Sequence, residues 1–168
     1  MLVSHAAFLI GCPVLNVSSP LDKWRFLIGS WRGTAENEFG EEGVVDSIHV
    51  FSEKLGGEYI TGKHEAWNAG KLVHKAASFL YYDPMQGKFR RKEIYSYGFV
   101  YNEVEYARTD GEIRFEVVSE PSPKQFAGTR WRSYIRKISD DKIAMGMECA
   151  KDEGKFESFG ETIATQEH

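Results

Sequence analysis

The chain has 168 residues, of which 42% are apolar and 27% are charged, which is typical of one globular domain with a single sizeable core. Its 21 Lys and Arg against 25 Asp and Glu give a net charge of −4, so it has no basic field to attract a phosphate backbone, and nucleic acid is not an expected partner. The 14% aromatic content favours strands, where flat rings pack across a pleated face. The composition excludes a disordered chain and favours an all-β domain.

An apolar run lies near the start of the chain, from Ala6 to Cys12. No Lys or Arg precedes it, as a secretory signal requires, and it is too short to span a bilayer. We therefore expect residues 1–18 to pack on the rest of the domain, with no membrane association. The two cysteines, Cys12 and Cys149, fit neither a disulfide framework nor a zinc site, which favours a cytoplasmic location.

A helix start follows at Ser18-Ser19-Pro20, because serine caps a helix, proline suits its first position and Asp22 lies in its first turn. Gly29 ends the pattern. The sequence therefore predicts a short helix within residues 19–28.

Ten strand-like runs come next, each separated from its neighbour by a turn signal such as Asn68-Ala69-Gly70 or Asp110-Gly111. They are residues 31–36, 44–53, 58–67, 72–82, 88–97, 100–108, 113–119, 129–138, 142–149 and 155–164. Consecutive antiparallel strands hide their edges most completely by closing on themselves. The sequence therefore predicts one domain, a single antiparallel up-and-down β-barrel of about ten strands over residues 29–165 with a short N-terminal helix.

The stretch from Phe26 to Gly33, centred on Gly29-Ser30-Trp31, resembles the calycin superfamily of lipocalin-like and fatty-acid-binding-protein-like barrels. In that superfamily a short helical turn leads into a Gly-x-Trp strand start. The resemblance implies that Trp31 plugs one end of the barrel beside Gly29. It also implies that an arginine of a late strand, Arg132 or Arg136, lies across the tryptophan ring.

Two closer groups resemble this chain. Leu55-Gly56-Gly57-Glu58-Tyr59-Ile60 followed by Tyr82-Asp83-Pro84 is similar to a set of uncharacterised calycin-like bacterial and archaeal proteins, which implies the fold and no established activity. The Gly-x-Trp-Arg-Gly start at residues 29–33 is similar to nitrobindin barrels, which bind haem. That second resemblance implies haem, with His64 or His74 as the interior ligand of the iron.

The run at residues 88–97 places Phe89, Arg91, Glu93 and Tyr95 on one face. That face is either interior or an aromatic surface rim. If it is interior, Arg91 and Glu93 must pair or meet a polar ligand, because an unpaired buried charge is costly. In the next run we expect the apolar set Val100, Val104 and Tyr106 to face inward, which leaves Glu103 and Glu105 in solvent and not an acid–base pair.

Four further residues are interior candidates. His64 shares a face with the small or apolar Ile60 and Gly62, which leaves room for a ligand. Trp131 shares a face with Ser133 and Ile135, and Met145 and Met147 lie on an apolar face of the neighbouring run, where methionines adapt to an apolar ligand or simply fill the core.

Our leading functional hypothesis is a binding protein that holds a small, largely apolar ligand with a polar or anionic group in the barrel. Its expected contacts are Trp31, His64, Arg91, Glu93, Tyr95, Trp131, Met145 and Met147. No metal or cofactor is predicted in this reading, and a homodimer through an exposed strand face is compatible with it.

Two alternatives stay open. One is a haem barrel acting on nitric oxide or peroxynitrite, as the nitrobindin resemblance implies. The other is a lyase-type enzyme, which predicts that Tyr95, Arg91 and Glu93 converge in one pocket and that at least one of them has a perturbed pKa. No sequence motif of a hydrolase, kinase or dinucleotide-binding enzyme is present, so no catalytic residue is assigned.

Overall fold

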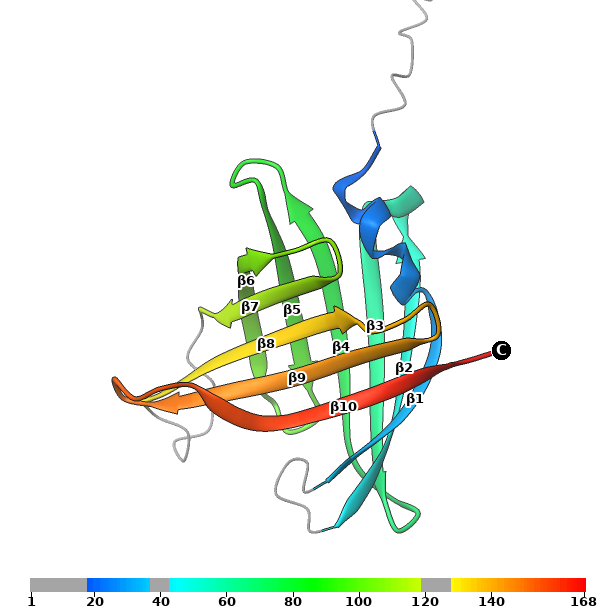
Figure 1. Cartoon of the computed structure of the whole chain (residues 1–168), viewed down its shortest axis with the longest axis vertical. Helices are drawn as coiled ribbons and strands as arrows, with labels where there is room; N and C mark the ends of the chain where they lie inside the picture. Colours follow the sequence, from blue (N-terminus) through cyan, green and yellow to red (C-terminus); the bar gives the residue numbers. More distant parts are fainter. Residues whose placement is uncertain (1–17, 37–42, 119–127) are drawn as a thin grey trace, which may run out of the picture.

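The computed structural model describes residues 18–36, 43–118 and 128–168. Ten antiparallel strands form a closed barrel in which each strand pairs with its neighbour in sequence and β1 pairs with β10 (Figure 1). The strands are β1 Gly29–Glu36, β2 Val44–Lys54, β3 Tyr59–Asn68, β4 Lys71–Asp83, β5 Lys88–Tyr95, β6 Val100–Arg108, β7 Glu112–Val117, β8 Thr129–Lys137, β9 Lys142–Lys151 and β10 Glu157–Glu167. The predicted fold class, strand number and up-and-down order are confirmed.

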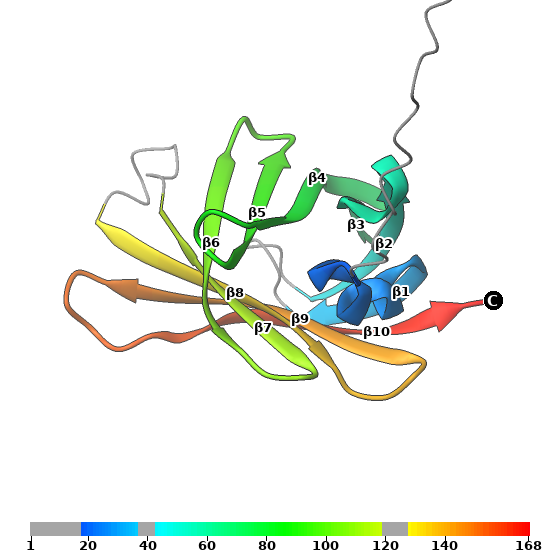
Figure 2. The same cartoon turned by 90° about the horizontal axis from the view of Figure 1, so that it is seen from above.

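A short 3-10 helix, η1 (Pro20–Leu27), lies at one end of the barrel (Figures 1 and 2). The Ser19 hydroxyl caps it by accepting a hydrogen bond from the Leu21 amide, as the sequence predicts. Trp31 of β1 is fully buried, and its indole Nε1 donates to the Leu27 carbonyl over 2.7 Å. This hydrogen bond ties the helix to the first strand. A second 3-10 turn, η3 (Leu55–Gly57), links β2 to β3.

The apolar core lies beneath η1. Its buried members come from the helix and from eight strands, and they are Leu21, Trp24, Leu27, Trp31, Ile60, Leu80, Phe89, Ile113, Phe115, Ile135, Ile143 and Ala164. A smaller cluster contains Ala76, Tyr95 and Tyr101. Along β5, Phe89 belongs to the first cluster and Tyr95 to the second, so Arg91 and Glu93 lie between two apolar regions of the interior. The inward placement of this face settles the question that the sequence left open.

The prediction that Val100, Val104 and Tyr106 of β6 face inward and leave Glu103 and Glu105 in solvent is wrong. Glu103 is only 2% exposed and Glu105 is 8% exposed, whereas Tyr106 is 38% exposed. The physical reason is the register with β5, which places Arg91 opposite Glu103. Glu105 in turn accepts a hydrogen bond from the Phe89 amide over 2.8 Å. Pairing of these carboxylates with buried donors outweighs the apolar character of the opposite face.

The expected position of Arg132 and Arg136 over Trp31 is also wrong. Both are on the outer face of β8, whose inward residues are Trp131, Ser133 and Ile135. The Arg132 guanidinium lies 3.9 Å from the ring centroid of Phe156, and that of Arg136 pairs with Glu161 over 3.1 Å. Trp31 is instead covered by η1.

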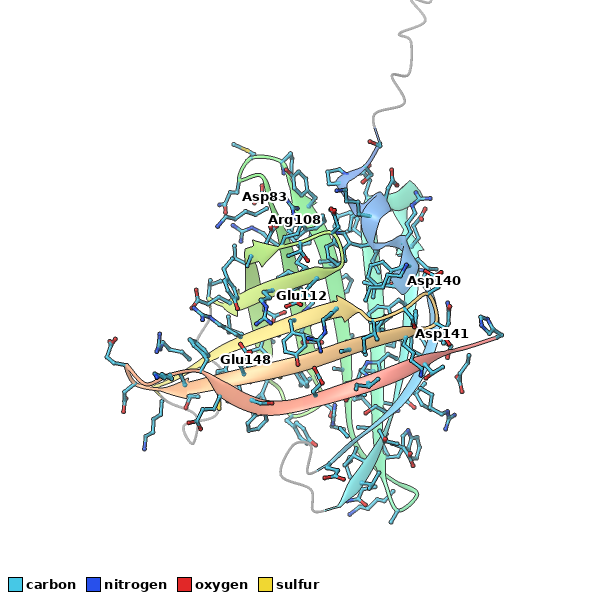
Figure 3. All side chains as sticks on the ribbon, viewed as in Figure 1. Asp83, Arg108, Glu112, Asp140, Asp141 and Glu148 are labelled. Carbon is cyan, nitrogen blue, oxygen red and sulfur yellow. The ribbon has the colours of Figure 1, made fainter. Side chains whose placement is uncertain are left out.

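The outer face of β7 to β9 is a surface of ion pairs. Glu112 and Glu148, both labelled in Figure 3, are each in contact with Arg114. The Arg114 guanidinium lies over the Tyr134 ring, 5.2 Å from its centroid. Gly146 of β9 lies under that ring, because a Cβ atom there would collide with Tyr134. The polar side of these strands therefore faces solvent, which leaves their apolar side for the interior.

Closure between β1 and β10 is partial. The ladder joins residues 30–34 of β1 to residues 163–167 of β10, so the first half of β10 pairs with β9 alone. A bulge between Ser158 and Gly160 bends this half.

The expected packing of residues 1–18 on the barrel concerns residues that lie outside the described ranges, apart from Ser18. None of the described helices has the length and apolar character needed to cross a membrane.

Candidate functional site

A cavity lies in the interior between β2–β5 on one side and β9 and β10 on the other. The centre of a water molecule can reach about 80 Å³ of it, which is room for about five to eight non-hydrogen atoms if one water needs about 10–15 Å³ of such volume. The wall is formed by His49, Phe51, Gly62, Lys63, His64, Ala76, Ser78, Arg91, Glu93, Tyr95, Met145, Gly146, Met147, Phe159, Gly160 and Thr162.

One part of this wall is apolar. Phe51, Met145, Met147 and Phe159 line it. Phe159 is 38% exposed, so the cavity reaches the outside near the first half of β10. The two methionines are unbranched and polarisable, which lets this side adjust to ligands of different shape.

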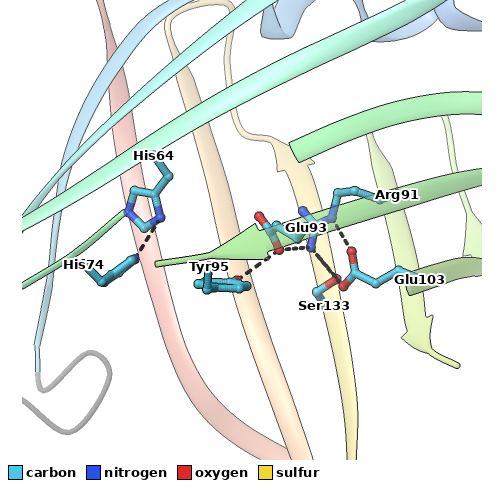
Figure 4. A network of polar contacts seen from close by, with 7 residues as sticks. All are labelled: His64, His74, Arg91, Glu93, Tyr95, Glu103 and Ser133. Carbon is cyan, nitrogen blue, oxygen red and sulfur yellow. Dashed lines mark hydrogen bonds and ion pairs between the residues drawn. The ribbon is translucent and has the colours of Figure 1, made fainter. Parts of the chain in front are cut away.

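The opposite part is a buried polar network centred on Arg91 (Figure 4). Its guanidinium binds both carboxylate oxygens of Glu103 on β6 and donates to the Ser133 hydroxyl on β8 over 2.8 Å. Ser133 donates in turn to Glu103 over 2.6 Å. Glu103 therefore neutralises Arg91 in a bidentate pair that a third strand completes.

Glu93 is a second carboxyl group beside the same guanidinium. One of its oxygens, Oε2, lies 3.3 Å from an Arg91 nitrogen and accepts the hydrogen bond of the Tyr95 hydroxyl over 3.0 Å. Among the described residues, no hydrogen bond reaches the other oxygen, Oε1. Glu93 therefore presents a carboxyl oxygen with unused hydrogen-bonding capacity at the cavity wall.

The network holds two carboxyl groups for one cation, and this imbalance governs its titration. Burial raises the pKa of Glu93 above its usual range, with Glu103 adding to the rise and Arg91 opposing it. Burial acts to lower the pKa of Arg91, but Glu103 and Glu93 outweigh it and raise that pKa. Burial and the nearby Glu93 carboxyl raise the pKa of Tyr95, so its phenol stays protonated and donates. Glu93 is consequently the group of this network that readily holds a proton.

A cluster of three histidines, His49, His64 and His74, lies beside the network; we call it the histidine stack. The rings of His49 and His64 are stacked with centroids 4.1 Å apart, and His64 meets His74 edge to face at 4.5 Å. His74 Nε2 and His64 Nδ1 share a hydrogen bond of 3.2 Å. Burial lowers the pKa of all three imidazoles, to about 3 for His49, to about 4 for His74 and well below 6.5 for His64. The stack is therefore neutral at physiological pH.

The two histidines that line the cavity have unused nitrogens. Nε2 of His49 and Nε2 of His64 are buried without a hydrogen-bond partner in the described part of the chain. Buried polar atoms of this kind cost free energy unless a ligand or water satisfies them. Both residues line the cavity, but the two nitrogens have almost no accessible surface, so a ligand reaches them only when a side chain rotates.

Six of the eight expected ligand contacts line the cavity, namely His64, Arg91, Glu93, Tyr95, Met145 and Met147. Trp31 does not, because it lies in the core under η1. Trp131 is buried beside the cavity and packs edge to face on Phe159 at 4.9 Å.

Sequence reasoning missed His49, Glu103 and Ser133 as members of the site. The sequence signal for His49 was that it lies at every second position with Val45, Ser47 and Phe51, which share its inward face on β2.

Haem does not fit this cavity as it stands. A porphyrin has four pyrrole rings, far more than the available volume holds, and the His64 ring is sandwiched between two other imidazoles. Within the described ranges, no group of three His, Cys, Asp or Glu residues is placed to hold a metal ion. Haem binding would need the barrel to expand, so no chemical step is assigned to it here.

The sequence matches no known protein-family model and no curated protein. Two solved structures are similar over most of the chain. The crystal structure of Rv2717c from M. tuberculosis has a TM-score of 0.63 at 18% identity, and the match covers 88% of this chain and 97% of that one. The S-type phycobiliprotein lyase CPES from Guillardia theta has a TM-score of 0.57 at 12% identity, with 89% and 93% covered. At such identities the likeness shows the fold alone, and it agrees with the closed, up-and-down barrel of ten antiparallel strands that this chain forms.

Proposed function

We propose that this protein binds a small, largely apolar molecule with one polar group inside its barrel. The observation that carries the proposal is the cavity of about 80 Å³, whose walls differ in character. Methionine and phenylalanine side chains line one part, and Glu93, Tyr95 and two neutral histidines line the other. This combination of an apolar cavity with a few fixed polar groups is typical of small-molecule sites.

The energetics favour filling this cavity. Each unsatisfied buried polar atom costs about 1–3 kcal/mol, and His49 and His64 contribute two such nitrogens to its wall. A ligand that reaches them when a side chain rotates recovers part of that free energy, and its apolar part replaces water next to Met145 and Met147. The polar network on β5, β6 and β8 holds the Glu93 side chain in one place, so little ordering is needed on binding.

An anionic group is not the expected partner of Arg91. The guanidinium is 10% exposed and already binds Glu103, Glu93 and Ser133. An anion near it would approach two carboxyl groups. We therefore expect the ligand to carry a polar group that is not an anion.

Isothermal titration with cyclohexanol, a probe of the right size, tests the proposal. We expect saturable binding to the wild type and its loss in Ala76→Leu, since Ala76 is buried at the cavity wall. Ala77→Leu is the matched control, because Ala77 is exposed on the outer face of the same strand. Equal binding in both variants, or no binding of any small apolar probe to the wild type, would refute an interior site.

Convergence of Tyr95, Arg91 and Glu93 in one cavity favours a second candidate function, proton-transfer catalysis. The lyase-type hypothesis predicted both this convergence and a perturbed pKa, and both are present. In this reading the Glu93 carboxyl donates its proton to a carbonyl oxygen of the substrate, and Tyr95 and Arg91 hydrogen bond to the carboxylate that forms.

Deuterium exchange at the α-carbons of cyclohexanone in D2O tests this second candidate. An enzyme of this kind accelerates the exchange by protonating the carbonyl oxygen, while solvent water removes the α-proton and returns a deuteron to the carbon. NMR should show faster exchange with the wild type than with Glu93→Gln. Equal rates for the two proteins would leave binding alone.

A further inference from the structure

We propose that the cavity selects a cationic head group, so that its ligand is a small organic amine whose ammonium group pairs with Glu93. This inference rests on the proposed function, since it names the ligand class of the same site. It replaces the anionic head group that the sequence suggested.

The charge count of the site is the first argument. Arg91 binds both oxygens of Glu103, whose side chain is fully buried, and makes one further contact with Glu93. Glu93 is therefore a carboxyl group in excess. All three nearby histidines are neutral at physiological pH. Lys63 also lines the cavity, but it is exposed to solvent, which screens its charge. When Glu93 is ionised, the buried trio of Arg91, Glu103 and Glu93 carries a net charge of −1, and a monovalent cation balances it.

The geometry of Glu93 is the second argument. Tyr95 and Arg91 both bind Oε2 of Glu93, which orients the carboxyl plane and leaves Oε1 outside the network drawn in Figure 4. A carboxylate oxygen fixed in this way is an acceptor aimed at a donor in the ligand. The Tyr95 hydroxyl already donates its hydrogen bond to Glu93, so it is not available to donate to the ligand.

The other polar atoms of the wall suit the same head group. A neutral imidazole whose proton is on Nδ1 offers Nε2 as an acceptor. If His64 donates from Nδ1 to Nε2 of His74, across their 3.2 Å contact, its unpartnered Nε2 has a free lone pair. An ammonium group has three donors and no acceptor, which matches Oε1 of Glu93, and the imidazole nitrogen once a side chain rotates to expose it.

The groups that face Glu93 define how binding depends on pH. They are Arg91 and Tyr95 on β5, Glu103 and Tyr101 on β6, and the imidazoles of His49, His64 and His74 on β2 to β4. Burial raises the pKa of Tyr101 to about 12, and those of the imidazoles are lowered to below 6.5. Because the pKa of Glu93 is raised by burial, Glu93 is the group in this set that loses a proton when a cation binds.

Isothermal titration with three probes of similar size tests the inference: cyclohexylamine, cyclohexanol and cyclopentanecarboxylate. We expect cyclohexylamine to bind the wild type at least tenfold more tightly than either of the others. In Glu93→Gln the amine should lose at least tenfold in affinity, while cyclohexanol stays within about twofold. Glu65→Gln is the control, because it removes an exposed carboxylate that pairs with Lys75 on the outer face.

A pH series separates an ammonium ligand from a neutral one. Below the raised pKa of Glu93, the amine displaces a proton, so its affinity should rise by up to tenfold per pH unit and then level off. Cyclohexanol should show no such rise. Tighter binding of cyclohexanol or of the carboxylate would overturn the cationic head group and leave the binding function intact. Failure of all three probes to bind the wild type would overturn both.

Discussion

Two substitutions in the Arg91 network should have very different effects on stability. Glu103→Gln leaves the buried guanidinium beside a neutral amide, and removal of one partner from a buried ion pair typically costs about 3–5 kcal/mol. We expect the lower end, about 3 kcal/mol, because Glu93 lies 3.3 Å from Arg91 and can ionise in place of Glu103. Glu93→Gln should cost less than about 1 kcal/mol, since Glu93 makes one contact with Arg91 and an amide keeps the shape of the carboxyl group.

The double variant makes this prediction sharper. With neither carboxylate left, Arg91 has no counter-ion, and the loss should reach about 5 kcal/mol. That exceeds the sum of the single losses by about 1 kcal/mol, which is the coupling expected when one group substitutes for another. Urea unfolding at pH 6, followed by the fluorescence of the four tryptophans, measures all four proteins with comparable slopes. If Glu93→Gln lost as much as Glu103→Gln, Glu93 would be the true counter-ion and the assignment of a spare carboxyl group would be wrong.

Three further predictions concern the barrel itself. A Cβ atom at Gly33 would collide with the backbone carbonyl of Ile163, so Gly33→Ala should lower the free energy of unfolding by at least about 1–3 kcal/mol. A Cβ atom at Gly160 would meet no atom within 4 Å, so Gly160→Ala should leave that free energy nearly unchanged in the same urea assay. Trp31→Phe removes the hydrogen bond to Leu27 and should cost about 2–3 kcal/mol. Trp24→Phe should cost less, because Nε1 of Trp24 has no hydrogen-bond partner in the described part of the chain. Similar losses would argue that the Trp31–Leu27 hydrogen bond does not stabilise the packing of η1 on β1. The buried histidines should make the protein acid-sensitive. In the folded state the pKa values of His49 and His74 lie below the unfolded value of 6.5, so the unfolded chain binds more protons below that pH. Stability should therefore be flat above about pH 7 and fall from there to about pH 4. His49→Gln should show a shallower fall, and an unchanged slope would contradict its burial in the neutral form.

The elements of this fold could be predicted from the sequence because their signals are local. Alternation of apolar and polar residues marks each strand, and glycine or aspartate marks each turn, so the ten strands and their order were recognisable. The inward face of β5 was identifiable as a candidate, since Phe89 and Tyr95 share its parity with Arg91 and Glu93.

The pairing within the interior was not local, and it was the part that sequence reasoning missed. The apolar residues of β6 favoured the wrong face, because nothing in that strand shows that Arg91 of the preceding strand stands opposite Glu103. Ser133 enters the network from β8 for the same reason. Arg132 was assigned to Trp31 by resemblance, but the aromatic ring that it covers belongs to Phe156. A register between strands decides such contacts, and a single strand's pattern does not contain it.

The most direct test of the interior site is an NMR titration of protein labelled with 13C at its methionine methyl groups. Met145 and Met147 line the cavity, whereas Met85 is 94% exposed and reports on non-specific effects. Addition of cyclohexylamine should shift the Met145 and Met147 methyl signals along one saturable curve and leave the Met85 signal in place. Shifts that never saturate, or that appear at Met85 as strongly as at the two cavity methionines, would contradict a binding site inside the barrel.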